Sequence, residues 1–196
     1  KPVKAATRPY TLFMKWLGFI FVYLLVTLAI LGFRPDISGK LLSTLFLSEL
    51  VILALVIITT SLSAVLLSYP DMFQRRALLF IPVFPLVLFI ATLVIEYISD
   101  MPPAPPPEHN IECLLAIMVL ALFPALLMFV LLRRQATTHY YLAGMVSLLT
   151  AVSIGAIILR LSENTDSIIH LISWHYAPMA GFGIIGLWLG RKFLKW

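Results

Sequence analysis

Six long apolar segments, separated by short polar ones, account for most of the chain. Each is about 20 residues long, and an α-helix of that length crosses the hydrocarbon core of a bilayer. The pattern predicts an all-α fold, a polytopic membrane helix bundle in which residues 1–196 form a single membrane domain. The predicted transmembrane helices cover residues 12–33, 46–67, 77–98, 111–132, 140–161 and 176–194.

Composition excludes the main alternatives to a membrane protein. Of the residues, 61% are hydrophobic and 12% are charged, whereas about 25% are charged in a typical soluble domain. Half the usual charge cannot cover the surface of a water-soluble globule of this size.

The sequence also has no HExxH, GxSxG or Walker motif and no pair of intramembrane aspartates. We therefore expect neither an enzyme nor a cofactor.

Basic residues gather in segments on one side of the predicted membrane. All of the 14 Lys and Arg residues except Arg34, Lys40 and Arg160 lie in or beside the N-terminal segment, the second and fourth loops or the C-terminal segment. The positive-inside rule assigns such segments to the cytoplasm, so both termini are predicted to be cytoplasmic. This asymmetry also accounts for the net charge of +5, and no direct binding of nucleic acid is expected.

Small residues recur at helical spacing on two predicted spans. They follow a four-residue period on the fifth span and form a GxxxG motif on the sixth. Such stripes let two helix backbones approach closely within a membrane. The close approach is expected either between helices of one chain or across the seam of a homodimer. The residues concerned are Ala143, Ser147, Ala151, Gly155, Gly186 and Gly190.

Three ionisable residues, Glu49, Glu96 and Arg160, lie about one helical turn inside the outer ends of predicted spans. Charges at that depth are costly, and they usually pair or face water. One interpretation is a Glu–Arg–Glu cluster that closes the outer side of the bundle. The other is that each side chain extends separately to the membrane interface.

Further polar groups near the outer side carry atoms that bind metals. Imidazole, carboxylate and thiolate together are ligands for Zn²⁺ or a softer metal. Their spacing matches no known zinc signature, and a single cysteine permits neither a thiol cluster nor an intramolecular disulfide. We therefore expect no metal site, and interfacial polar residues are the simpler interpretation. The candidates set aside in this way are His109, Glu112, Cys113, Asp166, His170 and His175.

The last outer loop carries its own helical pattern. Ile168, Ile169 and Ile172 share one helical face, and Asp166 is a residue type favoured at the N-cap. We expect residues 166–175 to form a surface helix that lies on the outer leaflet and leads into the sixth span.

Short motifs in a fixed order extend over almost the whole chain. They are Lys1-Pro-Val-Lys, the Gly32-Phe-Arg-Pro-Asp36 corner, Tyr69-Pro70, Cys113-Leu-Leu, Leu132-Arg-Arg134, Gly155-Ala156 and the ending Trp174-His-Tyr…Gly186…Gly190-Arg-Lys-Phe-Leu-Lys-Trp196. In order and spacing they resemble the NrsF-type membrane proteins. The resemblance implies a six-helix, multi-pass protein of the bacterial inner membrane that acts as an anti-sigma factor, a negative regulator of an extracytoplasmic-function sigma factor.

The resemblance also implies partners and a mechanism. The chain would retain a cytoplasmic sigma factor in an inactive state, respond to an envelope signal, and sit in the lipid bilayer. The alternative is a non-catalytic structural or accessory subunit of a membrane protein complex. Basic residues are available for contact with the sigma factor, although topology alone would place them on the same side. They are Lys1, Lys4, Arg8, Arg75, Arg76, Arg133 and Arg134.

Cysteine usage departs from the family pattern. Members commonly carry two outer cysteines, one opening the fourth span and one in the last outer loop. Cys113 matches the first, and the resemblance implies a signal-sensing role for it. Ser162 and Glu163 stand where the second is expected, so this chain has no thiol pair.

Overall fold

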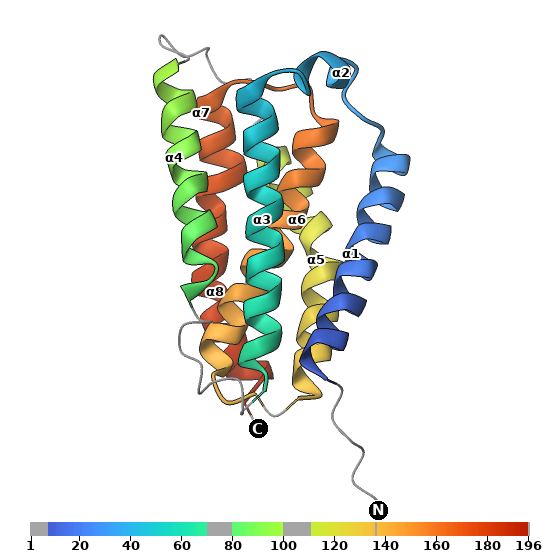
Figure 1. Ribbon diagram of the computed structural model, residues 1–196, viewed down its shortest axis with the longest axis vertical. Helices are drawn as coiled ribbons and strands as arrows, with labels where there is room; N and C mark the ends of the chain where they lie inside the picture. Colours follow the sequence, from blue (N-terminus) through green and yellow to red (C-terminus); the bar gives the residue numbers. More distant parts are fainter. Residues whose placement is uncertain (1–7, 70–79, 100–110, 136, 196) are drawn as a thin grey trace, which may run out of the picture.

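The computed structural model describes residues 8–69, 80–99, 111–135 and 137–195, and every regular element in these ranges is a helix (Figure 1). The predicted all-α fold is confirmed for this part of the chain. The elements are α1 (Pro9–Leu31), α2 (Ile37–Lys40), α3 (Thr44–Leu67), α4 (Val83–Ser99), α5 (Ile111–Arg133), α6 (Tyr140–Ser162), α7 (Ile168–His170), a π-helix (Leu171–Tyr176) and α8 (Ala177–Phe193).

Within the described ranges, five helices are long and apolar enough to cross a membrane. Four are α1, α3, α5 and α6, and the fifth is the continuous helix Ile168–Phe193. Their length and composition support a membrane protein. The described part of α4 is shorter, at 17 residues, and residues 77–79 of that predicted span lie outside the described ranges. The six-span count and the cytoplasmic placement of both termini stay predictions.

Helix α6 forms the centre of the bundle. It packs against α3, α5 and α8, so its side chains are buried at almost every position from Ala143 to Arg160. Two of its buried hydroxyl groups have short contacts: Ser147 donates to the Ala143 carbonyl at 2.6 Å, and Thr150 is 2.8 Å from Thr60 of α3. Helix α6 runs from one end of the bundle to the other (Figure 1).

The predicted small-residue stripes pack inside this chain. A β-carbon added at Gly186 of α8 would lie 2.6 Å from the Gly144 carbonyl oxygen of α6. One added at Gly155 would lie 2.7 Å from the carbonyl oxygen of Ile117 in α5. The homodimer suggested for these faces is therefore unsupported, because the monomer already covers them. The buried positions are Ala143, Ser147, Ala151, Gly155, Gly186 and Gly190.

Residues 166–175 were predicted to form a surface helix that leads into the sixth span. The helix and its continuation are confirmed from Ile168 onward, but its placement on the surface is wrong. This segment is the first part of the last long helix, which runs without interruption through α7, the π-helix and α8 (Figure 1). Ile168 and Leu171 are buried, because α7 packs on α4 and the π-helix packs on α5. Ser167 occupies the N-cap position that was predicted for Asp166. The amphipathic pattern was real, but its apolar face meets neighbouring helices rather than lipid.

Candidate functional site

Two polar clusters are formed by residues from helix ends and loops at one end of the bundle. This end carries α2 (Figure 1), and we call it the α2 end. The first cluster centres on Arg34, which is 1% exposed. Gly32 ends α1 with a φ of 81°, a conformation that favours glycine, and the chain then turns back toward α6. The Arg34 backbone N–H donates to the Leu161 carbonyl at 3.0 Å. This contact holds the guanidinium against the end of α6.

Arg34 joins two acidic side chains. Its Nε lies 2.6 Å from Asp36 Oδ1, and its Nη2 lies 3.0 Å from Asp166 Oδ2. Asp166 also accepts hydrogen bonds from Lys40 Nζ at 2.8 Å and Arg160 Nη1 at 3.2 Å. Three cations therefore converge on one carboxylate, which fastens the α1–α2 corner to the segment after α6.

These contacts shift the ionisation of the loop residues. Partial burial raises the pKa of Asp166, but the hydrogen bonds from Arg34, Lys40 and Arg160 outweigh it and hold the pKa well below its usual range. The hydrogen bond from Arg34 likewise lowers the pKa of Asp36. The same bond is the main reason that the pKa of Arg34 is raised. Asp166, Asp36 and Arg34 are therefore charged at neutral pH.

The network continues inward through Arg160. Its Nε lies 3.0 Å from Oε2 of Glu49 in α3, and Glu49 also accepts a hydrogen bond from the Tyr176 hydroxyl. The Glu49–Arg160 part of the predicted Glu–Arg–Glu cluster is confirmed. Glu96 of α4 lines a cleft of about 270 Å³ together with Arg160 and Asp166. Separate extension of Glu49 and Arg160 to the membrane interface is thereby excluded.

The second cluster consists of Cys113, Glu163, His170 and His175, whose sulfur, oxygen and nitrogen ligand atoms all lie within 4.8 Å of one another. Glu163 is its hub. Its Oε1 accepts a hydrogen bond from Cys113 Sγ at 3.4 Å, and its Oε2 lies 3.3 Å from His175 Nε2. His170 Nε2 lies 3.7 Å from Glu163 Oε1. We call these four residues the Cys–His cluster.

Three separate segments supply the Cys–His cluster. Cys113 lies in the first turn of α5, and Glu163 directly follows α6. His170 and His175 are five positions apart, a spacing that an α-helix with 3.6 residues per turn would put on different faces. The intervening π-helix has i→i+5 hydrogen bonds, so a five-residue step returns close to the same face. The two imidazole rings consequently meet, with centroids 5.2 Å apart.

Only part of the set of metal-binding candidates from the sequence comes together. Cys113, His170 and His175 lie in the Cys–His cluster, whereas Glu112 is exposed and not part of it. Asp166 belongs to the first cluster, which we call the arginine network and which consists of Arg34, Asp36, Lys40, Glu49, Arg160 and Asp166. His109 lies outside the described residues. Glu163 was not among the candidates. The signal that could have found it is its position, since it occupies the place where the family's second outer cysteine is expected.

A sequence model of one protein family, described as negative regulator of sigma F (NrsF), matches residues 1–196. The chain belongs to the NrsF family. The resemblance seen in the motifs is thus confirmed over the whole chain, and a sigma factor is the partner that the family description implies. No curated protein and no solved structure matches the chain.

The end of the bundle opposite α2 carries Arg8, Arg133 and Arg134, three of the basic residues proposed for sigma-factor contact in this NrsF-family chain, and we call it the basic end. Helix α1 begins there, and α5 and α8 end there (Figure 1). Arg8 directly precedes α1 and is exposed, as are Arg133 and Arg134 at the end of α5. The other proposed contact residues, Lys1, Lys4, Arg75 and Arg76, lie outside the described ranges.

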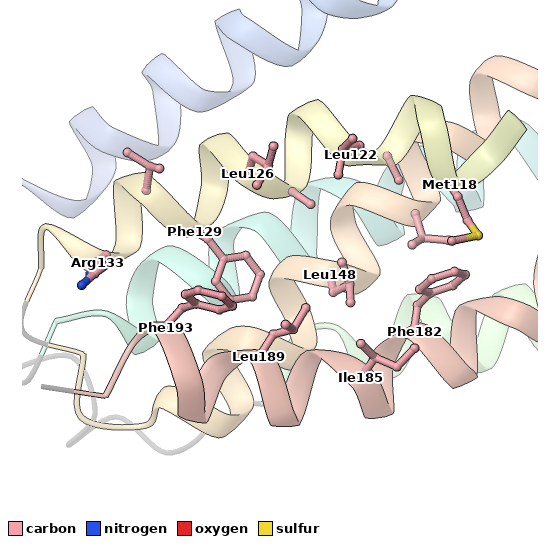
Figure 2. A pocket seen from close by; sticks show the side chains of 14 residues that line it. Met118, Leu122, Leu126, Phe129, Arg133, Leu148, Phe182, Ile185, Leu189 and Phe193 are labelled. Atoms are coloured by element: carbon pink, nitrogen blue, oxygen red, sulfur yellow. The ribbon is translucent and has the colours of Figure 1, made fainter. Parts of the chain in front are cut away.

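An apolar groove of about 450 Å³ runs between α5 and α8 toward the basic end. Figure 2 shows Phe129 and Phe193 close together at one end of it, with Leu148 of α6 between the two helices. Arg133 is its charged lining residue. Acyl chains fit such a lining, which agrees with a lipid bilayer as the surroundings of this NrsF-family chain.

Proposed function

We propose that this chain is a membrane-embedded anti-sigma factor. It retains a cytoplasmic sigma factor in an inactive state at the bacterial inner membrane and responds to an envelope signal. The description of its family, negative regulator of sigma F, supports the regulatory role, and its long apolar helices support a location in a membrane. The proposal assigns no catalytic step to the chain.

The observation that carries the proposal is the clustering of exposed cations at the end of the bundle opposite the two polar clusters. Arg8 directly precedes α1, and Arg133 and Arg134 lie at the end of α5; these two helix ends are far apart in sequence but share the basic end. A composite surface of this kind can hold a soluble protein without a separate folded domain. Basic side chains would steer an acidic face of the sigma factor and hold it with a salt-dependent affinity. Lys1, Lys4, Arg75 and Arg76 extend the proposed contact set.

The opposite end is proposed to receive the envelope signal. Cys113 and the arginine network both lie at the α2 end, where they link the beginnings or ends of several helices. Helix α6 is buried along its length and reaches from there to the basic end. A change at the α2 end that shifts α6 would therefore alter the spacing of the helices that present the cations.

The test is retention of the sigma factor by membranes that contain the full chain. The cognate sigma factor, co-produced with the wild-type chain, is expected to sediment with the membranes and to leave its target promoter silent. The double variant Arg133→Gln/Arg134→Gln should release it and raise transcription. A matched control, Arg191→Gln/Lys192→Gln, neutralises two adjacent exposed cations at the end of α8 and should keep repression.

Two results would contradict this assignment at different levels. Equal loss of retention in both double variants would show that total charge at the basic end, and not the α5 residues, holds the partner. A sigma factor that stays soluble beside the wild-type chain would defeat the anti-sigma proposal itself, and the accessory-subunit alternative would then be preferred.

A further inference from the structure

We propose that the Cys–His cluster is a four-ligand site for a divalent transition-metal ion, with Zn²⁺ as the best chemical match. The ligands are Cys113 Sγ, one carboxylate oxygen of Glu163, and one imidazole nitrogen each from His170 and His175. The inference does not rest on the anti-sigma proposal, because it concerns only the chemistry at the α2 end.

The distances are close to those of a tetrahedral zinc site. Zinc bonds of about 2.0–2.3 Å at the tetrahedral angle put neighbouring ligand atoms about 3.3–3.6 Å apart. Glu163 Oε1 lies 3.4 Å from Cys113 Sγ and 3.7 Å from His170 Nε2, and the other oxygen, Oε2, lies 3.3 Å from His175 Nε2. The widest separation in the cluster is within 4.8 Å, so side-chain rotations suffice to close the set around one ion.

The imidazole of His175 gives an independent indication of a ligand. The side chain is 1% exposed, and neither Nδ1 nor Nε2 forms a hydrogen bond with the described residues. Nε2 does lie 3.3 Å from Glu163 Oε2, but this contact does not meet hydrogen-bond geometry. Oε2 of Glu163 is also buried and likewise forms no hydrogen bond within the described residues. Buried polar atoms are almost always satisfied, because desolvation without a partner is costly. A metal ion between these atoms would use the lone pairs that the protein leaves unused.

The backbone favours the same interpretation. The π-helix, a rare conformation often found at functional sites, is what places His170 and His175 on one face. An uninterrupted α-helix would separate the two rings. The local irregularity therefore has the specific effect of assembling two nitrogen ligands.

The donor set selects the kind of ion. One thiolate and two imidazoles favour Zn²⁺ and similar transition metals, whereas Ca²⁺ and Mg²⁺ prefer sites made of oxygen ligands. The Cys113 thiolate and the Glu163 carboxylate together would balance the charge of a divalent cation. Such neutrality suits a cluster whose Cys113, His170 and His175 side chains are all buried. Binding would join the start of α5, the end of α6 and the last long helix.

The experiment uses the purified full-length chain in detergent, stripped with a chelator and titrated with Zn²⁺ or Co²⁺. We expect one equivalent per chain, a rise in melting temperature on Zn²⁺ binding, and a Co²⁺ spectrum with thiolate-to-metal charge transfer and tetrahedral d–d bands. Cys113→Ser should abolish the charge-transfer band. Glu163→Gln and His175→Gln should each weaken Zn²⁺ binding by more than the roughly 10–100-fold typical of losing an outer hydrogen-bond partner of a metal ligand.

Glu112→Gln is the matched control, because Glu112 is the exposed neighbour of Cys113 and lies outside the cluster. It should bind Zn²⁺ like the wild type. Unchanged affinity in both Glu163→Gln and His175→Gln would overturn the proposal. If a variant fails to fold, titration of the wild-type chain still tests the proposal. A Co²⁺ complex without a thiolate charge-transfer band, or no metal binding at all, would exclude the site.

Discussion

Arg160 of α6 and Glu49 of α3, 111 positions apart in the sequence, form a buried ion pair with 3.0 Å between Nε and Oε2. Both side chains are almost fully withdrawn from solvent. The pair joins two of the central helices, and the Tyr176 hydroxyl adds the last long helix through Glu49. Removing one partner of a buried pair leaves the other charge uncompensated, which makes this contact a sensitive point of the fold.

Glu49→Leu should lower the free energy of unfolding by about 3–5 kcal/mol, because it leaves Arg160 without its main buried partner. The double variant Glu49→Leu/Arg160→Met removes both charges and should recover a large part of that loss. Thermal unfolding of the single and double variants in the same detergent measures the difference. Strictly additive losses from Glu49→Leu and Arg160→Met would show that the two residues are not coupled.

Acid should weaken the α2 end through Asp166. Its pKa in the folded protein lies well below the usual value, because Arg34, Lys40 and Arg160 outweigh the effect of burial. A lowered pKa in the folded state stabilises the protein fully above the unfolded pKa of about 4, and that contribution is lost as the pH falls further. The melting temperature of the wild type should therefore drop below about pH 5 more steeply than that of Asp166→Asn, which should start lower at neutral pH. Parallel curves would contradict the role of this carboxylate.

Helix α8 offers two glycines that test close packing. Gly186→Leu should lower the free energy of unfolding by about 1–3 kcal/mol or more, because a side chain there would collide with the backbone of Gly144. Gly181→Leu, on the same helix, meets nothing within 4 Å and should melt like the wild type. If both variants melt alike, the α6–α8 crossing does not have the tightness described.

The orientation in the membrane can be tested with introduced thiols in a Cys113→Ser background. Cys113 itself is buried and is a poor probe, whereas Ser99 at the end of α4 and Arg134 after α5 are exposed. A membrane-impermeant maleimide should label Ser99→Cys in intact spheroplasts and Arg134→Cys only after permeabilisation. The reverse pattern would invert the predicted topology and move the basic end outside.

Most of the long helices follow from the sequence with small errors at their ends. The exceptions are the last long helix, which begins at Ile168 rather than 176, and α4, whose described part begins at Val83. The spans predicted at 111–132 and 140–161 appear as Ile111–Arg133 and Tyr140–Ser162. Such agreement has a physical cause: apolar segments of this length can satisfy their backbone hydrogen bonds in lipid only by becoming helical. The span predicted at 12–33 ends earlier, at Leu31, because Gly32 adopts a positive φ and terminates the helix.

The sequence alone determined that the chain is helical, that its helices are apolar, and that its cations and acids are segregated. Only the tertiary structure decided which side chains meet. It brought Cys113 beside Glu163, 50 positions away, and it buried the segment that was predicted to lie on the outer leaflet. It also introduced the π-helix that aligns His170 with His175. Hydropathy records which segments avoid water, but the rotation of a helix about its axis and the identity of its neighbour depend on packing between helices.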